Sequence, residues 1–442
     1  MNSMKIKIRP KDQRKADRRI VGQMVTAIWR RIAMLSLLCA LVGSAAQIAG
    51  AQTESTLYSF CSLPNCTDGA TPAPNLLFTA QGSLYGVAEG GTGNFGGGVV
   101  FELNLAGTET LIYSFNAINQ GLGPNGGLIQ DSAGNFYGTT AGGGYDHKPC
   151  KKLAGCGLVY KLTNGTETVL YNFLGSTDGD EPNGALVLDK QGNLYGTTYS
   201  GGGGGGAHET GTIFKVTSTG TETVLHRFGA VEADGKFPNA GLVMDKKGNL
   251  YGTTIYGGID GDYGPGLMCH NKCGVVFELT AAGVEKVLYA FQGSEKRDGA
   301  APFAGLILDS KGNLYGTTFA GGLHGQGTVF KLTPTGQETV LYSFGLPPDA
   351  GFPVGRLVMD AQGNLYGATA FGGTHGQGTV FKLTPSNQEK VLYSFTGGAD
   401  GGSPLDGLAM DPQGNLYGTT FVGGIFNNQC LVGCGVVFKV TP

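Results

Sequence analysis

The chain has 442 residues, of which 80 are glycine and 18 are proline, and 40% are hydrophobic. Glycine is far above its usual share of about 7%, and the formal net charge is −3 at pH 7. A chain this rich in glycine and proline would be disordered if it were not periodic, but this one repeats and is apolar enough to build a core. The composition therefore predicts many short strands joined by turns.

The N-terminal segment differs from the rest of the chain. Ten Lys or Arg residues lie within 1–31, followed by the apolar run "IAMLSLLCALVGSAA" (32–46) and by "AGAQ". A secretory signal peptide has the same order of a basic segment, an apolar segment and small residues. We therefore expect a signal peptide over 1–51 with cleavage after Ala51. The apolar run is shorter than the about 20 residues that span a bilayer. An uncleaved N-terminal anchor is the alternative.

Cleavage would change the charge of the chain. Ten basic and two acidic residues would be lost, which leaves 20 basic and 31 acidic residues and a net charge near −11. An acidic surface argues against nucleic acid and against anionic membrane as partners. We therefore expect a secreted or periplasmic monomer with no membrane span after cleavage.

A repeat runs through the mature chain. The motif Leu-Tyr-Gly, or Phe-Tyr-Gly in one copy, recurs seven times at intervals of 51 to 64 residues, with its tyrosine at Tyr85, Tyr137, Tyr195, Tyr251, Tyr315, Tyr366 and Tyr417. A period of this length with many strand and turn residues is typical of a propeller blade.

Each period predicts four strands, which we name a, b, c and d from the propeller axis outward. In one copy these are "GLILD" (305–309), "LYGTT" (314–318), "GTVFKLT" (327–333) and "ETVLYSF" (338–344). The apolar and β-branched residues favour strands. "SKGN" between strands a and b is a turn, in which Asp309 can accept backbone N–H bonds.

The two ends of the chain predict how the ring closes. A strand d sequence, "STLYSF" (55–60), precedes any strand a, and the chain stops after a strand c sequence, "GVVFKVT" (435–441). If the first strand d completes the last blade, no open sheet edge is left. The predicted fold is therefore all-β: a seven-bladed β-propeller over 52–442, with four antiparallel strands per blade and an N-terminal outer strand in the last blade.

The run "GLxxDxxGNLYGTTxxGGxxGQGTVFKLT" resembles the GloVer (Gloeo/Verruco) tandem-repeat family of secreted bacterial proteins, over essentially the whole mature chain. The first copy departs from it, with Thr79 in place of the Asp and Ser83 in place of the Asn. Atypical terminal repeats are expected in such proteins. The resemblance implies export and a repeat domain, and it brings no catalytic residues to this chain.

The four-strand blade also predicts two unlike faces. The d to a crossovers and the b to c loops share one face, which we call the crossover face, and the short a–b and c–d turns share the other. Nearly all variation in length falls on the crossover face, including "GGGGGG" (201–206) and a long loop at 257–274. Since variable loops on a rigid scaffold carry function, any binding site is expected there.

Eight cysteines remain after cleavage, and they fall in four close pairs. An even number of cysteines in an exported protein indicates disulfides. Metal ligation is the alternative, because "CHNKC" (269–273) has Cys and His close together. The expected pairs are Cys61 with Cys66, Cys150 with Cys156, Cys269 with Cys273 and Cys430 with Cys434.

Histidine and acidic residues are the candidate ligands in the loops. Five histidines in b to c loops could bind a ligand or a metal, or simply fill glycine-rich loops: His147, His208, His270, His324 and His375. Two acidic groups could hold Ca²⁺, although neither matches a full calcium loop: Asp178, Asp180 and Glu181, and Asp260 with Asp262. Asp-Gly before Pro is also good turn chemistry. We expect no cofactor beyond a possible Ca²⁺.

Three functions compete. The sequence contains no nucleophile elbow, phosphate loop or HExxH motif, which favours a non-catalytic module that binds an extracellular polysaccharide or protein through the crossover face. The enzyme alternative is a polysaccharide lyase or glycoside hydrolase that uses loop His and Asp residues. The third is a structural component of the cell surface.

Overall fold

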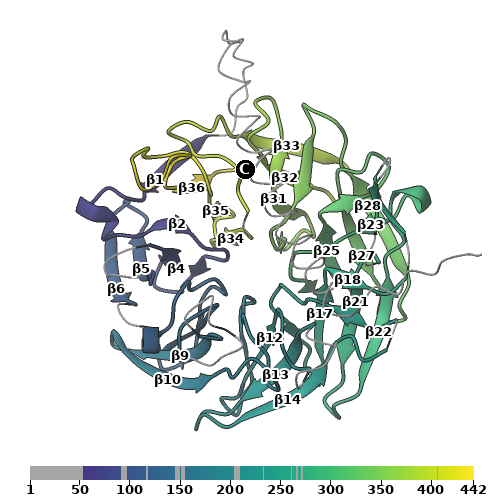
Figure 1. The fold of residues 1–442 in the computed structure, drawn as a ribbon. Helices are drawn as coiled ribbons and strands as arrows, with labels where there is room; N and C mark the ends of the chain where they lie inside the picture. The colour runs from purple at the N-terminus through teal and green to yellow at the C-terminus, as the bar shows by residue number, and fades with distance from the viewer. Residues whose placement is uncertain are drawn as a thin grey trace, which may run out of the picture. The chain divides into compact units, whose positions relative to one another are not determined.

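In the computed structural model, the described residues are 53–442 except for 91–96, 116–117, 145–149, 151–154, 204–209, 232, 260, 265–266, 270–271 and 406. They form seven antiparallel blades in a ring, so the fold is the predicted seven-bladed β-propeller (Figure 1). The predicted signal peptide lies outside the described residues. Within them, no helix has the length and apolarity to cross a membrane.

The blades are numbered in chain order, and their strands are given from a to d. Blade 1 is β3 (Leu77–Phe78), β4 (Ser83–Glu89), β5 (Val99–Asn104) and β6 (Glu109–Ser114); blade 2 is β7 (Ile129–Gln130), β8 (Phe136–Thr140), β9 (Leu158–Thr163) and β10 (Thr166–Asn172); blade 3 is β11 (Val187–Leu188), β12 (Leu194–Thr198), β13 (Thr212–Val216) and β14 (Glu222–Arg227). Blade 4 is β16 (Val243–Met244), β17 (Leu250–Thr254), β21 (Val275–Leu279) and β22 (Glu285–Ala290); blade 5 is β24 (Ile307–Leu308), β25 (Leu314–Thr318), β27 (Thr328–Leu332) and β28 (Glu338–Ser343). Blade 6 is β30 (Val358–Met359), β31 (Leu365–Gly372), β32 (Thr379–Leu383) and β33 (Glu389–Ser394); blade 7 is β34 (Ala409–Met410), β35 (Leu416–Thr419), β36 (Val436–Val440) and β1 (Glu54–Ser59).

The ring closes as the two chain ends predict. The strand order in blade 7 is β1-β36-β35-β34, and β1 pairs antiparallel with β36 from Glu54 opposite Val440 to Ser59 opposite Val436. The first strand of the described chain is therefore the outer strand of the last blade, and the edge of β36 is covered.

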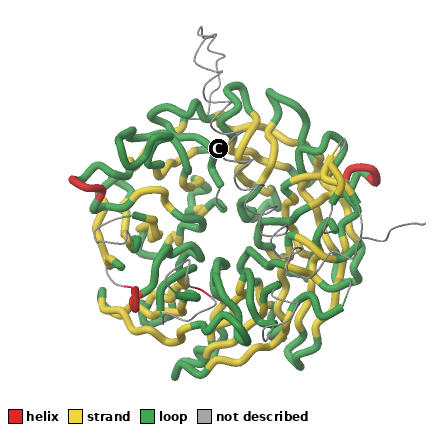
Figure 2. The backbone as a smooth tube through the Cα atoms, in the orientation of Figure 1, coloured by secondary structure: helices red, strands yellow, loops and turns green. Residues whose placement is uncertain are grey.

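Short elements lie in the connections between the main strands. Four short strands in the crossovers pair antiparallel with segments of the blade that follows: β2 (Ala70–Pro72) with β4, β15 (Gly235–Lys236) with β18 (Tyr256–Gly257), β23 (Gly299–Ala300) with β26 (Ala320–Gly321), and β29 (Ala350–Pro353) with β31. The b to c loop of blade 4 holds the hairpin of β19 (Asp262–Gly264) and β20 (Leu267–Met268). The short 3-10 turns, red in Figure 2, are crossover segments too: η2 (Pro64–Cys66), η3 (Ile118–Gln120) and η5 (Ser294–Lys296).

Strand a is shorter than expected. The sequence predicts strand a of blade 5 over 305–309, but β24 covers only Ile307–Leu308. The residues before it face the neighbouring blade instead, because the Ala304 carbonyl accepts a 3.0 Å hydrogen bond from Thr253 Oγ1 of blade 4. After Leu308 the chain enters the a–b turn. The short strand thus lies between a residue bonded to blade 4 and the a–b turn.

The core lies between blades and is built from aromatic pairs. The Phe that follows each strand d packs edge-to-face on the aromatic residue of strand c in the next blade, as Phe291 does on Phe330 with ring centroids 5.1 Å apart. The same contact closes the ring, since Phe60 packs on Phe101 at 5.2 Å. All four rings are fully buried. Every blade interface therefore repeats one apolar contact.

The glycine of the Leu-Tyr-Gly motif makes room for this ring. A Cβ added to Gly252 would lie 2.5 Å from Cζ of Phe277 in its own blade. Side-chain atoms cannot approach so closely without displacing the ring. The strand b glycine is thus required by packing.

The aspartate at the end of strand a fixes the a–b turn. Asp309 accepts hydrogen bonds from the backbone N–H groups of Lys311 and Asn313, both at 2.8 Å, and from the Asn313 amide at 2.7 Å. The Tyr315 hydroxyl donates a fourth at 3.3 Å. Asp, Gly, Asn and Tyr of the repeated motif thus form one hydrogen-bonded unit.

Candidate functional site

The crossover face is held together by hydrogen bonds between neighbouring blades. The Phe352 N–H of the crossover into blade 6 donates to the Gln326 carbonyl of blade 5 at 2.7 Å, and Phe319 N–H, after strand b of blade 5, donates to the Ala301 carbonyl of its own crossover at 2.9 Å. The crossovers therefore lie beside the b to c loops on one face. This arrangement confirms the one inferred from the order of the strands.

At one position, each crossover has a residue in a left-handed backbone conformation, and in six of the seven this residue presents a side chain. The residue before the crossover proline has φ between 47° and 64° in all seven blades: Thr71, Gly123, Glu181, Phe237, Ala301, Phe352 and Ser403. Six of the seven are not glycine, although the left-handed region costs such a residue about 1–2 kcal/mol. In each case the N–H donates to a carbonyl of the preceding blade, which offsets this cost. A fixed backbone thus carries a variable side chain around the face.

Aromatic rings gather around the left-handed residue Phe352 over blades 5 and 6. Phe303, Phe319, Phe352 and Phe371, which we call the aromatic row, are each partly exposed. Neighbouring ring centroids in the row are 5.4 Å, 5.0 Å and 5.7 Å apart. The row joins two crossovers to the ends of two b strands, so its shape is set by the scaffold.

A second aromatic group lies over blades 3 and 4. Phe237, the left-handed residue of that crossover, has its ring centroid 5.3 Å from that of Tyr199 and 6.0 Å from that of Tyr256. Tyr256 is buried, while Tyr199 and Phe237 are partly exposed. This group is smaller than the aromatic row and repeats its construction.

A cavity of about 690 Å³ lies among the inner strands of blades 1, 5, 6 and 7. Its wall is both apolar and polar: Phe78, Ile307, Val358 and Met410 line it together with Asn75, Thr79, Arg356 and Asp411. Surrounding protein lowers the pKa of the Arg356 guanidinium. The cavity thus has a mixed lining, to which Arg356 contributes a cationic donor group and Asp411 an acidic one.

Four disulfides form among the described residues, and they are the four expected pairs: Cys61–Cys66, Cys150–Cys156, Cys269–Cys273 and Cys430–Cys434. Each closes a short loop, so each stabilises the fold only modestly. The first lies in a crossover and the other three in b to c loops. They stiffen segments of the crossover face.

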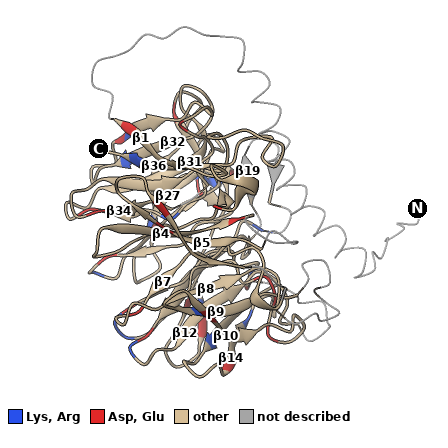
Figure 3. Cartoon of the chain, turned by 90° about the vertical axis from the view of Figure 1, so that its left-hand side faces the viewer, with Lys and Arg blue, Asp and Glu red and all other residues tan. Residues whose placement is uncertain are grey.

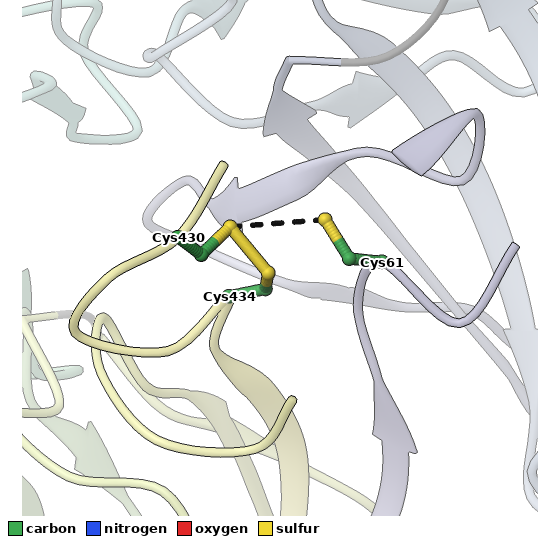
Figure 4. Close-up of side chains that lie close together, drawn as sticks. All are labelled: Cys61, Cys430 and Cys434. Atoms are coloured by element: carbon green, nitrogen blue, oxygen red, sulfur yellow. Dashed lines mark hydrogen bonds between the residues drawn. A yellow bond between two sulfur atoms is a disulfide. The ribbon is translucent and has the colours of Figure 1, made fainter. Parts of the chain in front are cut away.

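Two disulfides meet where the ring closes. Cys61 Sγ lies 3.7 Å from Cys430 Sγ (Figure 4), although Cys61 is bonded to Cys66 and Cys430 to Cys434. Cys61, Cys430 and Cys434 are all buried. Because their sulfurs are in disulfides, no thiolate is available there to hold a metal. The sulfur atoms instead pack the first crossover against the last b to c loop.

Two of the five predicted loop histidines lie among the described residues. His147, His208 and His270 lie outside the described residues, while His324 and His375 are exposed in the b to c loops of blades 5 and 6. His375 Nδ1 lies 3.0 Å from Thr374 Oγ1. Among the described residues, neither His324 nor His375 belongs to a group of three potential metal ligands. Their role in ligand binding stays a prediction.

The acidic residues at 178–181 are engaged in the crossover. Asp178 is 4% exposed and accepts hydrogen bonds from the Tyr171 hydroxyl at 2.7 Å and from the Leu174 and Gly175 N–H groups. Asp180 accepts a hydrogen bond from Ser200 Oγ. Glu181 is the left-handed residue of its crossover. Asp178 thus acts as a turn acceptor here, and Ca²⁺ binding by the three residues stays a prediction.

The other predicted calcium group is not fully described. Asp260 lies outside the described residues, and Asp262 begins β19 with a side chain that is not described. Ca²⁺ at this pair also stays a prediction.

Sequence reasoning missed the aromatic row and the cluster of His226, Asp234 and Glu285, whose ligand atoms lie within 4.8 Å of one another. Both aromatic groups could have been found from one signal, since Phe352 of the row and Phe237 of the second group stand directly before the crossover proline. The cluster could not, because Glu285 comes from a different blade.

Comparison with known proteins identifies the repeat. A family model described as the Gloeobacter/Verrucomicrobia repeat matches residues 43–267 and 266–442. No curated protein sequence matches this chain.

Solved structures share the fold. The extracellular domain of a protein described as a hybrid two component system from B. thetaiotaomicron is 13% identical, with a TM-score of 0.53, over 88% of this chain and 41% of that chain. A second such domain from the same organism is 10% identical, with a TM-score of 0.53, over 87% of this chain and 39% of that chain. The present chain thus spans about two fifths of the length of these proteins, and at this identity the likeness shows the propeller fold alone.

Proposed function

The chain belongs to the Gloeobacter/Verrucomicrobia repeat family, and we propose that it is an exported, non-catalytic module that binds an extracellular polysaccharide on its crossover face. The aromatic row carries this proposal. Four partly exposed rings in contact with one another form an apolar surface that water wets poorly, and the C–H face of a sugar ring stacks well on an aromatic side chain.

The row is also organised before any ligand arrives. Two of its rings are carried by crossovers that are hydrogen-bonded to neighbouring blades, and the other two by the ends of b strands, so few rotatable bonds need to be fixed on binding. Phe319 and Phe352 lie at its centre, with ring centroids 5.0 Å apart. A chain of sugar units laid along the row would contact several rings at once.

The distribution of charge bears on the kind of ligand, and the disulfides bear on the compartment. The blue and red segments of the side view in Figure 3 are scattered and separated by uncharged chain, which suits a neutral ligand better than a polyanion. The four disulfides fit an oxidising compartment. Export would place the crossover face where polysaccharides occur.

The proposal is tested by retention on a panel of insoluble and immobilised polysaccharides, with and without Ca²⁺. We expect the purified protein to be retained on at least one neutral polysaccharide. Phe319→Ala and Phe352→Ala should each weaken retention roughly tenfold, because a central aromatic contact is lost. Phe426→Ala is the matched control: Phe426 is 57% exposed and belongs to the b to c loop of blade 7, outside the row.

Several results would contradict the proposal. Undiminished retention of the two row variants would place the ligand elsewhere. Release of shortened glycan products by the wild-type protein would favour the lyase or hydrolase alternative. Retention on no polysaccharide would favour a protein partner, and concentration-dependent self-association would favour a structural role.

A further inference from the structure

One histidine occupies a position at which the other blades have tyrosine. A Phe follows each strand d, and the residue two positions before this Phe is a tyrosine in six blades: Tyr58, Tyr113, Tyr171, Tyr289, Tyr342 and Tyr393. Blade 3 carries His226 in β14 instead. The substitution replaces a hydroxyl with an imidazole, which is a common metal ligand.

The tyrosine hydroxyl normally binds an aspartate of the following crossover. Tyr342 donates to Asp349 Oδ2 at 3.0 Å, and four other blades have the same bond. In blade 3, His226 Nε2 lies 3.3 Å from Asp234 Oδ2. The imidazole therefore faces a carboxylate at the place where a phenol usually does.

A second carboxylate comes from the next blade. Strand d begins with Glu in six blades, and in blade 4 this residue is Glu285 of β22. The ligand atoms of His226, Asp234 and Glu285 lie within 4.8 Å of one another. Glu285 Oε1 is a buried atom without a hydrogen-bond partner, as is the corresponding glutamate oxygen in five other blades, and among the described residues only in blade 4 does this oxygen lie beside an imidazole that already contacts an aspartate.

From this arrangement we propose that His226, Asp234 and Glu285 bind a divalent transition-metal ion of the zinc class between blades 3 and 4. Tetrahedral zinc with bonds of about 2.0–2.1 Å holds its ligand atoms about 3.3 Å apart. The His226–Asp234 pair already has this separation. Glu285 lies at the start of its strand and is only partly buried, so its carboxylate can move in to complete the set.

The ligands are oriented by their surroundings. Asp234 is 3% exposed, and its two oxygens accept hydrogen bonds from the Gly229 N–H at 2.8 Å and the Gly235 N–H at 2.7 Å. The His226 ring packs edge-to-face on Phe228 with centroids 4.8 Å apart. Such contacts fix ligand geometry in metal sites. The His226 side chain is 20% exposed, which leaves a path from solvent.

The types of ligand atom also determine which metal ion is expected to bind. Calcium and magnesium take oxygen ligands, whereas an imidazole with two carboxylates suits zinc and its neighbours in the first transition row. A divalent cation would neutralise two carboxylates that lie close together. The ion would thus fasten blade 3 to blade 4.

The test is the zinc content of the purified protein after removal of metal with EDTA and dialysis against Zn²⁺. We expect one tightly bound ion per chain, an increase in melting temperature on binding, and a Co²⁺ form with the visible absorption of a four-coordinate site. His226→Tyr restores the residue of the other blades, so it should fold, bind one ion fewer and lose both the temperature shift and the Co²⁺ absorption. His375→Gln, which removes an exposed loop histidine, should keep all three properties.

A gain-of-site variant tests the same geometry in another blade. Tyr342→His would place an imidazole beside Asp349, with Glu389 from the next blade, whose Oε1 is also buried and lacks a hydrogen-bond partner. We expect this variant to bind two ions per chain. A wild-type protein without bound zinc, or a folded His226→Tyr variant with undiminished zinc, would overturn the proposal. A folded Tyr342→His variant that still binds one ion would show that the three ligands do not suffice.

Discussion

At the scale of single residues, the repeated motif is a set of mutually dependent contacts. Asp309 holds the backbone of its turn, the Asn313 amide and the Tyr315 hydroxyl, while the glycine after the tyrosine leaves space for a strand c ring. Partial burial alone would raise the pKa of Asp309, but the hydrogen bonds from Asn313, Lys311 and Tyr315 together lower it. The carboxylate is therefore bound better than it would be in water.

Removal of this carboxylate should destabilise one blade. We expect Asp309→Ala to lower the free energy of unfolding by about 1–3 kcal/mol, because four donors, three of them partly buried, lose a charged acceptor. Urea denaturation measures the effect. Ser310→Ala, at the next position of the same turn, is the control and should change stability by less than about 0.5 kcal/mol. Equal effects of the two substitutions would contradict the role assigned to Asp309.

At the scale of elements, the outer strand β1 decides whether the ring is closed. It pairs with β36 over Glu54–Ser59, and Phe60 directly after it packs on Phe101 of blade 1. Blade 7 would keep three strands without it, and the edge of β36 would be open to solvent. Open edges favour pairing with other chains.

Deletion of residues 52–60 should therefore lower both stability and cooperativity. We expect a broader thermal transition at lower temperature in calorimetry, together with oligomers in size-exclusion chromatography. A synthetic peptide of residues 53–60 should restore the transition by adding the missing strand, whereas a scrambled peptide should not. An unchanged melting curve after the deletion would show that β1 is dispensable.

At the scale of the whole molecule, strand d of each blade carries a half-buried glutamate that faces the preceding interface. Burial raises the pKa of Glu338 to about 8, with a contribution from Asp298, and it raises the pKa of the others to about 6 or 7: Glu54, Glu109, Glu167, Glu222, Glu285 and Glu389. Each folded-state pKa exceeds the unfolded value of about 4.5. Between about pH 4.5 and pH 8 the folded protein thus binds more protons than the unfolded chain.

The glutamates should make the propeller less stable as pH rises through this interval. We expect a higher melting temperature near pH 5 than near pH 8, and Glu338→Gln should reduce the difference. Glu295→Gln, in an exposed crossover turn, is the control and should leave it unchanged. A melting temperature that is constant from pH 5 to pH 8 would contradict this prediction. Below about pH 4 the turn aspartates act in the opposite direction, since their lowered pKa values favour the folded state only while they are ionised.

The sequence by itself determined the blade count, the strand order, the ring closure and the disulfide pairs. These features rest on short-range information: a period, a turn motif and cysteines four to six residues apart. The sequence predicted strand a of blade 5 as longer than it is, and the residue just before that segment, Ala304, bonds to Thr253 of the neighbouring blade.

The tertiary structure alone decided which residues meet across blades. Phe319 and Phe352 are 33 residues apart in the chain, and His226 and Glu285 are 59 apart, yet each pair shares one surface or cluster. No local pattern encodes such pairs, because they depend on how the ring brings successive blades together. The repeat fixes the scaffold, and the few positions where copies differ supply the aromatic row and the His226 cluster.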